Sequence, residues 1–340
     1  MSTEILLDIE SGSAGVGIIT DGVLARTARV AFGRETPRDA RAYLPQLKMA
    51  LETLLPQCAT PAPSVVYIVI SAPWYLGKID YHAQESKEIV RLTKSTITAL
   101  VPPADKSHGI LVESGPIAIT VNGYRTRVRG PVSGRKVGVR SYTSFIDAET
   151  EATINGALEK VWPHTKRAYH TFPHLASHIS DTSAPKAPLQ SGEILVRIGA
   201  ESTDICLMFG GSVLRNGMIT EGARSVTRRA RPSASVDAES RFALLDAGKL
   251  SEKESLAVNK LLLEASEPWR NEFSGLIAVM ADAYPIPLVI QLVLDREYAW
   301  FNHVLAFASA ESTISIVSAK EESTDVPLEI LTRAILAHDE

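Results

Sequence analysis

The segment that most constrains the fold runs from residue 194 to residue 230. Its sequence is ILVRIGAESTDICLMFGGSVLRNGMITEGARSVTRRA. Apolar runs separated by turn residues predict a buried strand, a small polar turn, a second strand, a Gly-Gly hairpin, a third strand and a helix opened by a glycine loop. The turn at 199–204 presents backbone N–H groups and hydroxyls at a strand end, and such turns hold phosphates. Helix N-termini do the same, because their first N–H groups lack intrahelical partners.

A second turn of this kind stands near the start of the chain, where residues 5–19 read ILLDIESGSAGVGII. The two hairpins lie roughly half a chain apart, which predicts a duplicated architecture. A chain of 340 residues is also too long for one simple core and is expected to form two or more lobes.

The pair of hairpins resembles the two phosphate-binding hairpins of the actin-like ATPase superfamily. The details are most similar to the FtsA family of cell-division proteins and the PilM family of type IV pilus assembly. Three further stretches support this branch: SAPWY at 71–75, VNGY at 121–124 and FPHLA at 172–176. The resemblance implies an α/β, actin-like (ribonuclease H-like, duplicated) fold, with two lobes and a small α+β subdomain inserted in the first.

This resemblance also divides the chain. Residues 1–83 together with 166–188 are expected to form the first actin-like lobe. Residues 84–165 are expected to form the inserted α+β subdomain, and residues 189–340 the second lobe.

Hydrophobic patterning within these parts predicts the individual elements. In the first lobe we expect a helix beginning at Thr36 and strands at 5–9, 14–19, 23–31 and 65–70. The inserted subdomain is expected to hold a long helix at 85–101, a helix after Asp147, and strands at 110–113, 117–122 and 137–145. The second lobe is expected to end with strands at 288–294 and 312–318 and a helix at 328–337 that packs on that lobe.

The resemblance also implies which residues would bind ATP and Mg²⁺. Asp8 matches the carboxylate that holds the metal, and it is the one metal ligand that we expect. The nucleotide-binding set implied by the family pattern is Asp8, Ser11, Gly12, Ser13, Gly199, Ser202, Thr203, Asp204 and Gly222. No residue is assigned a catalytic role.

Several positions depart from the family pattern. Glu10 stands where a glycine is usual, and Ala200 replaces a second glycine. Arg197 stands at the leading acid of the second hairpin, so the charge at a metal-handling position is inverted. The stretch LVLDRE at 292–297, which contains Asp295, occupies the place of the Gly-rich adenosine turn, and without glycines the backbone cannot approach the adenine ring closely.

These substitutions leave three interpretations open. The chain is a working Mg-ATPase; or Arg197 contacts phosphate directly and permits binding without hydrolysis; or Asp8, Thr203 and Asp204 only satisfy the backbones of their turns. The expected cofactors are accordingly ATP and Mg²⁺, or none.

Two other clusters of side chains carry weaker signals. His164, His170, His174 and His178 lie close in sequence; His174 and His178 have a spacing that can bind zinc, but ordinary packing or surface histidines are the favoured interpretation. Basic runs occur at Arg224, Arg228, Arg229 and Arg231, and at Arg125, Arg127, Arg129, Arg135, Lys136 and Arg140. The first run attracts phosphate or is a solvated face; the second docks an acidic partner or is a solvated hairpin.

Composition limits the possible partners and the compartment. The formal net charge of −4 gives no reason to expect a nucleic-acid partner, and the two cysteines favour a reducing cytoplasm. The N-terminus lacks signal-peptide features, and no apolar run reaches the ~20 residues that span a bilayer. We therefore expect a cytoplasmic protein without direct membrane insertion, held at the inner membrane face by a partner.

The function that follows is an actin-like scaffold resembling PilM or FtsA, acting in type IV pilus assembly or cell division through protein contacts, with ATP binding weakened or lost. Its partners would be proteins of a membrane-linked machine, and self-association stays open. The first alternative is an active Mg-ATPase that polymerises as actin homologues do. The second is a phosphotransferase resembling sugar kinases, for which no catalytic acid stands out.

Overall fold

The computed structural model describes most of the chain. The described residues are 2–33, 40–59, 62–126, 132–182, 192–209, 211–230, 238–281, 289–308, 313–316 and 325–339. The expected helix start at Thr36 and the basic residues Arg127, Arg129 and Arg231 lie outside these ranges.

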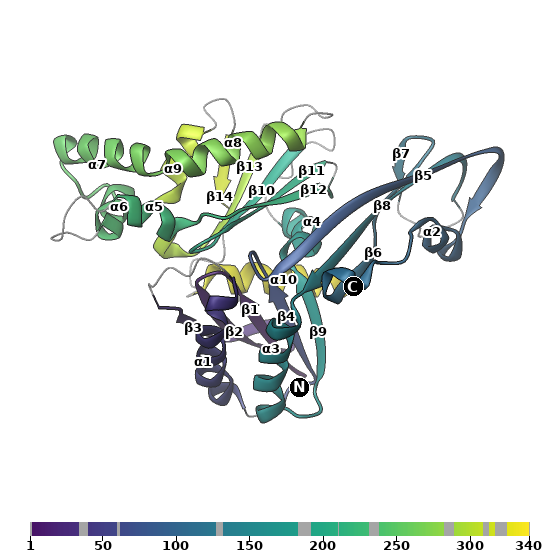
Figure 1. The fold of residues 1–340 in the computed structure, drawn as a ribbon, viewed down its shortest axis with the longest axis horizontal. Helices are drawn as coiled ribbons and strands as arrows, with labels where there is room; N and C mark the ends of the chain where they lie inside the picture. The colour runs from purple at the N-terminus through teal and green to yellow at the C-terminus, as the bar shows by residue number, and fades with distance from the viewer. Residues whose placement is uncertain are drawn as a thin grey trace.

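The chain forms two five-stranded sheets with the same topology (Figure 1). In the first lobe the strands lie in the order β3-β2-β1-β4-β9, with bounds Val23–Ala31, Ser13–Thr20, Thr3–Ile9, Val65–Ile70 and Lys166–Thr171. In the second lobe the order is β12-β11-β10-β13-β14, with bounds Ser212–Ile219, Thr203–Phe209, Gly192–Ile198, Val289–Leu294 and Thr313–Ile316. In both sheets the first three strands are antiparallel and the last three are parallel. This repeated topology confirms the expected duplication.

Alternation along the first strand of each sheet explains why both faces are buried. In β1, Ile5, Leu7 and Ile9 belong to the core on the outer face of the first lobe, whereas Leu6 points to the layer between the lobes. In β10, Ile194, Val196 and Ile198 face the outer core of the second lobe and Leu195 faces the middle layer. Because side chains alternate along a strand, Asp8 and Arg197 also face the middle layer.

Helices complete a five-layer arrangement (Figure 1). On the outer face of the first sheet lie α1 (Leu44–Leu54) and α3 (Ala148–Val161). Between the two sheets lie α4 (Phe172–Thr182) and α10 (Val326–Asp339), whose apolar side chains share one core with both sheets. The outer face of the second sheet is covered by α5 (Ala223–Arg229), α6 (Ala238–Asp246), α7 (Glu252–Ala265), α8 (Glu267–Ala281) and α9 (Phe301–Ala308).

The C-terminal helix α10 corrects one expectation. It was predicted to pack on the second lobe, yet its main contact is with α4, and it touches β1, β2 and β3 of the first lobe as well as β13. Leu328, Leu331 and Ile335 are buried in the core between the lobes. Helix α10 therefore joins the two lobes.

The inserted subdomain is a four-stranded antiparallel sheet that projects as an arm (Figure 1). Its order is β5-β8-β6-β7, with bounds Tyr75–Leu92, Val132–Ile146, Ile110–Val121 and Tyr124–Thr126, and the short α2 (Lys94–Leu100) packs on it. The predicted helix at 85–101 is wrong over its first half, because β5 continues to Leu92 and pairs with β8. The two strands predicted at 110–113 and 117–122 are one strand, β6, with local irregularities.

The remaining elements agree with the sequence to within a few residues, including β4, β13, β14 and the helix after Asp147. The lobe boundaries proposed from the sequence stay a prediction. No helix in the described ranges combines the length and the apolar character needed to cross a membrane.

Candidate functional site

The candidate site lies where the first strands of the two lobes face each other. Asp8 stands in the penultimate pair of the β1–β2 hairpin, opposite Gly15. Arg197 stands in the penultimate pair of the β10–β11 hairpin, opposite Asp204. The two residues thus occupy corresponding positions in the duplicated fold, one from each lobe. A pair of acids here would repel unless a cation stood between them, whereas an acid and an arginine neutralise each other.

Arg197 and Asp8 form an ion pair buried between the lobes. Arg197 Nη2 donates to Asp8 Oδ1 at 2.6 Å and to Oδ2 at 2.7 Å, and Arg197 Nη1 donates to Ser71 Oγ at 2.5 Å. Asp8 is 0% exposed and Arg197 2%. The guanidinium group therefore lies on the carboxylate that the family pattern gives to the metal.

A second arginine binds the same carboxylate. Arg29 Nη2 donates to Asp8 Oδ2 at 2.8 Å, and Arg29 Nε donates to Asp325 Oδ2 at 2.7 Å just before α10 begins. Burial alone would raise the pKa of Asp8, but Arg197 and Arg29 outweigh it and hold the pKa below its ordinary value. Asp8 is therefore ionised at neutral pH.

The turn of the first hairpin binds the turn of the second, which was predicted to hold a phosphate. Ser11 Oγ accepts hydrogen bonds from the backbone N–H of Glu201 at 2.9 Å and of Ser202 at 3.2 Å. The N–H of Gly199 donates to the carbonyl of Ser202 within its own turn. A hydroxyl of the first lobe thus occupies two N–H groups of the turn that was predicted to hold a phosphate.

The two turns also touch sterically. A Cβ atom on Gly12 would lie 2.1 Å from Cβ of Ala200, and one on Gly199 would lie 2.9 Å from Ser11 Oγ. Ser13 lies beside them, where its Oγ donates to Glu10 Oε1 at 2.6 Å and accepts from Arg29 Nη1. The glycines therefore permit contact between the lobes and not the approach of a ligand.

The N-terminus of α5 is occupied in the same way. The N–H of Ala223 donates to the carbonyl of Gly199 at 3.0 Å, and the N–H of Arg224 donates to that of Ala200 at 2.8 Å. A Cβ atom on Gly222 would lie 2.3 Å from the carbonyl oxygen of Gly199, so only glycine allows this close approach. The first N–H groups of α5 point at the second hairpin turn and are used there.

The polar residues of the second hairpin bind protein groups as well. Asp204 Oδ2 accepts from the N–H of Ala72 at 2.9 Å, and Asp204 Oδ1 accepts from the Tyr75 hydroxyl at 2.6 Å. Ser202 Oγ donates to the carbonyl of Ala72 at 2.8 Å. Thr203 Oγ1 donates to the carbonyl of Glu221 and accepts from the indole of Trp269. All nine predicted site residues are therefore brought to one place, where protein contacts hold them.

Buried acidic side chains lie around this junction, and their pKa values are raised. Burial raises the pKa of Asp204 to about 6 and that of Asp295 to about 7, and it also raises the pKa of Glu10. These carboxyl groups supply no positive charge to a triphosphate brought here.

The described residues do not fit Mg-ATP in this arrangement. Both oxygens of Asp8 accept from guanidinium groups, and the N–H groups of the turn are taken by Ser11. Two arginines of the basic run on α5 also bind carboxylates of the protein. Arg228 pairs with Glu201 and Arg229 with Glu221, each through two hydrogen bonds. Of the predicted basic patch on the arm, Arg140 lies over the ring of Tyr81.

Sequence reasoning missed Arg29 and Asp325 at this junction, and it missed Glu113 and His338 elsewhere. Arg29 lies on an edge strand and Asp325 before the last helix, so neither follows a recognisable turn motif. His170, His174 and His338 come together near the end of α10, and Glu113 lies beside them.

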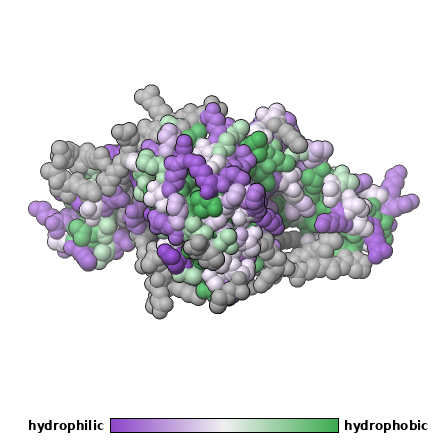
Figure 2. Space-filling view, turned by 90° about the horizontal axis from the view of Figure 1, so that it is seen from below, coloured by the Kyte–Doolittle hydropathy of each residue, from purple (hydrophilic) through white to green (hydrophobic). Residues whose placement is uncertain are grey.

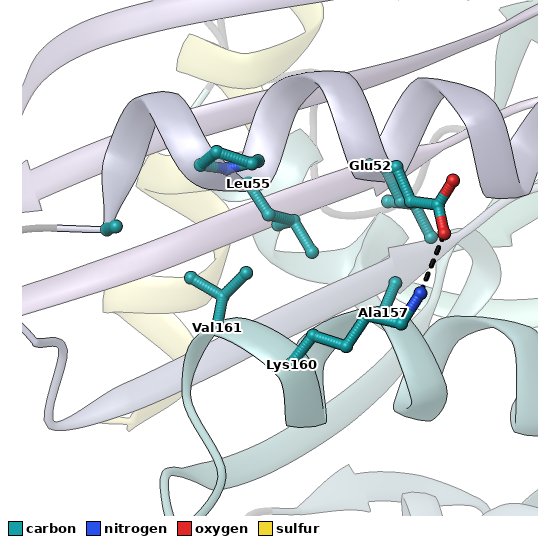
Figure 3. Close-up of a pocket in the computed structure, with 8 residues that line it drawn as sticks. Glu52, Leu55, Ala157, Lys160 and Val161 are labelled. Atoms are coloured by element: carbon teal, nitrogen blue, oxygen red, sulfur yellow. Dashed lines mark hydrogen bonds and ion pairs between the residues drawn. The ribbon is translucent and has the colours of Figure 1, made fainter.

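Two hollows lie away from the junction. One, of about 510 Å³, lies between α1 and α3 (Figure 3). Its walls are apolar and include Leu55 and Val161, and the Glu52–Lys160 ion pair, at 2.8 Å, lies across it. The other, of about 330 Å³, lies where the arm meets the first lobe and is lined by Trp74, Leu76 and Phe145 among others.

Comparison with known proteins supports the fold. No protein-family model matches the chain, and no curated protein sequence matches it. Among solved structures, the chain is similar to one of the PilM–PilN type IV pilus biogenesis complex, with 13% identity, 98% of each chain covered and a TM-score of 0.59. It is more distantly similar to the ethanolamine utilization protein EutJ of Carboxydothermus hydrogenoformans, with 9% identity, 98% and 90% coverage and a TM-score of 0.47. A ROK hexokinase of Thermus thermophilus shows 13% identity, 99% and 100% coverage and a TM-score of 0.40.

The first of these likenesses, together with the duplicated sheets, shows that the chain has a PilM-like version of the actin-like ATPase fold.

Proposed function

We propose that this chain, which has the actin-like ATPase fold, is a scaffold protein of a membrane-linked machine and works through protein contacts without using nucleotide. The observation that carries this proposal is the Asp8–Arg197 ion pair, which joins the lobes at the position where an ATPase would hold its metal. Ser11 supports it, because its hydroxyl satisfies the turn that would bind phosphate.

The energetic argument follows from burial. To admit Mg-ATP the lobes would have to separate at Arg197 and give up the buried ion pair with Asp8. Ser11 would have to leave two buried N–H groups, at about 1–3 kcal/mol for each unsatisfied group. A nucleotide would need to recover this before any net binding, so the closed arrangement opposes it.

The likeness to a structure of the PilM–PilN complex favours a pilus role over a role in cell division. We infer that the chain acts in the cytoplasm, at the inner face of the membrane, through a membrane-protein partner. We also propose that copies of this chain bind one another, as an actin-like scaffold can.

The junction between the arm and the first lobe offers a surface for such a partner. Leu76 is 56% exposed on the rim of the hollow of about 330 Å³, and Ile110 and Leu111 are exposed beside it on β6. On the face shown in Figure 2, the visible part of the arm carries apolar residues among polar ones. We assign this surface to a cytoplasmic peptide segment of the membrane partner whose apolar side chains enter the hollow.

Phosphate release tests the catalytic part of the proposal. The purified chain is incubated with ATP and Mg²⁺, and wild type is compared with Asp8→Ala. We expect release no faster than in a protein-free blank for both. Release by wild type that disappears in Asp8→Ala would instead support the active Mg-ATPase, whereas ADP formed without free phosphate, and only in the presence of a sugar, would support a phosphotransferase.

Peptide binding tests the scaffold part. Fluorescent peptides are made from the cytoplasmic segments of membrane proteins encoded by neighbouring genes, and their anisotropy is measured as the chain is added. We expect one peptide to bind, and Leu76→Glu to weaken it tenfold or more. Met49→Glu is the matched control, because Met49 is also exposed but lies on α1. Equal loss in both variants, or binding by none of the peptides, would count against this surface.

A further inference from the structure

A second cluster of side chains lies apart from the junction of Asp8 and Arg197. His170 is near the end of β9, His174 is in the first turn of α4, and His338 is in the last turn of α10. One ring nitrogen from each histidine lies within 4.8 Å of the others. Three separate elements therefore direct imidazole groups to one point.

The rings are oriented around a common centre. The rings of His170 and His174 are stacked, with their centroids 6.1 Å apart and their planes 27° apart. The ring of His338 stands edge-on to both, at 5.4 Å and 80° from His170 and at 5.1 Å and 85° from His174. Two rings are therefore stacked and the third stands edge-on to them. Three imidazoles arranged in this way can surround a small ion.

Glu113, on β6 of the arm, supplies a carboxylate behind these rings. Its Oε1 lies 3.2 Å from His170 Nδ1 and 3.7 Å from His174 Nδ1. Its Oε2 accepts from the N–H and the hydroxyl of Thr171, which fixes the carboxylate. Metal-binding histidines usually donate their second ring N–H to such a carboxylate, which sets the tautomer and leaves the other nitrogen for the metal.

His174 directs its Nδ1 toward the same carboxylate, at 3.7 Å from Glu113 Oε1, which leaves Nε2 as the nitrogen for a metal ion. Its Nδ1 is buried and makes no hydrogen bond among the described residues.

We propose that His170, His174 and His338 bind a zinc ion, with Glu113 as the carboxylate that orients the rings. Zinc takes imidazole nitrogens at about 2.0–2.1 Å in a tetrahedral arrangement, so ligand nitrogens lie about 3.4 Å apart. The rings must therefore turn inward by rotation of their side chains. Water is the fourth ligand, and His178, whose Nε2 is 3.3 Å from His338 Nδ1, supports the third ring.

The site would tie four parts of the molecule together. It joins α10 to α4 and β9, and Glu113 extends the connection to the arm. The α10 helix of 14 residues is about 21 Å long, and its other end follows Asp325, which binds Arg29. Zinc would thus fix the far end of the helix that closes the lobe junction.

Zinc titration of the full chain tests this proposal. The protein carries no histidine tag and is first stripped with a chelator, and ZnCl₂ is added in a calorimeter and in thermal melts. We expect one ion per chain in wild type. His174→Ala and His338→Ala should each weaken binding at least tenfold and lose the zinc-dependent rise in Tm. Glu113→Gln should weaken binding by about 10–100-fold, as for other orienting carboxylates.

His164→Ala is the matched control, since His164 is exposed and lies outside the cluster. It should bind zinc as wild type does. Neither heat nor thermal stabilisation in wild type would overturn the proposal, and so would zinc binding that is unchanged in both His174→Ala and His338→Ala. Should one variant fail to fold, the other decides, and Co²⁺ bound to wild type gives a further test through its tetrahedral absorption bands.

Discussion

Arg197 and Asp8 stand at corresponding positions on the first strands of the two lobes and form a buried ion pair, with Arg197 Nη2 2.6 Å from Asp8 Oδ1. A fold made by duplication brings these two positions face to face. With acids at both, the lobes would need a cation between them. With one arginine, the protein supplies that positive charge itself, and the lobes close on each other.

Removing only the arginine should therefore destabilise the chain. Arg197→Met leaves Asp8 buried with Arg29 alone, and we expect a loss of about 3 kcal/mol in the free energy of unfolding. The double variant Asp8→Val with Arg197→Met should recover most of this loss, because no buried charge is left unpaired. Urea unfolding of the single and double variants measures the coupling.

The exposed Glu52–Lys160 pair provides a control for this experiment. Lys160→Met should leave the urea midpoint unchanged, since exposed ion pairs contribute little. Equal effects of Lys160→Met and Arg197→Met would contradict the special role of the buried pair.

Ser11→Ala should open the contact between the two turns. The N–H groups of Glu201 and Ser202 would lose their acceptor, and each buried unsatisfied group costs about 1–3 kcal/mol. Hydrogen exchange at these two amides, followed by NMR, should accelerate relative to wild type. Ser86→Ala, at an exposed hydroxyl that accepts one N–H, should change neither stability nor exchange at the junction.

Gly222→Ala should displace α5 from the second hairpin turn. The new Cβ would lie 2.3 Å from the carbonyl oxygen of Gly199 and 2.6 Å from the carbonyl carbon of Ala200, and backbone atoms cannot rotate away. We expect strong destabilisation in thermal melts. Gly275→Ala is the opposite case, because Gly275 lies on α8 with nothing within 4 Å of a new Cβ, so this change should stabilise by about 0.5–1 kcal/mol.

The pH dependence of stability should reveal Asp295. Its pKa is raised from 3.8 to about 7, so the folded state binds its proton more tightly than the unfolded state does. The stability gained in this way is fully present below pH 3.8 and is lost as pH rises through about 7. Asp295→Asn should therefore be more stable than wild type at pH 8, by on the order of 2–4 kcal/mol, with the gap closing toward pH 5.

Comparing the two proteins at each pH isolates this group. Asp204, whose pKa is raised to about 6, also titrates in this range but is present in both proteins. A gap between Asp295→Asn and wild type that stays constant from pH 5 to pH 8 would show that Asp295 has an ordinary pKa.

Much of the fold could be predicted from sequence because its signals are local. Alternating apolar residues and turn glycines mark both hairpins, and the buried run at 65–70 marks β4. The predicted helix was wrong at 85–92 because an exposed edge strand with charges on both faces has no period-two pattern of apolar residues. Its structure depends on pairing with β8, far along the chain.

The two turns could be located from the sequence, but the contacts between them could not. The residues of the two turns were identified from their family pattern, yet nothing local indicates that Arg197 binds Asp8, 189 residues away. The same holds for His338 and His170, which only the packing of α10 on α4 and β9 brings together. Contacts between distant segments depend on how the lobes and the last helix pack.

Calorimetric titration of the purified chain with ATP and ADP, with and without Mg²⁺, tests the central claim most directly. We expect no heat of binding and no rise in Tm at millimolar nucleotide, because Arg197 binds Asp8, the proposed metal ligand, and Ser11 binds the turn proposed to hold phosphate. Micromolar, Mg²⁺-dependent binding that is lost in Asp8→Ala would contradict this and would show that the two lobes open to admit nucleotide.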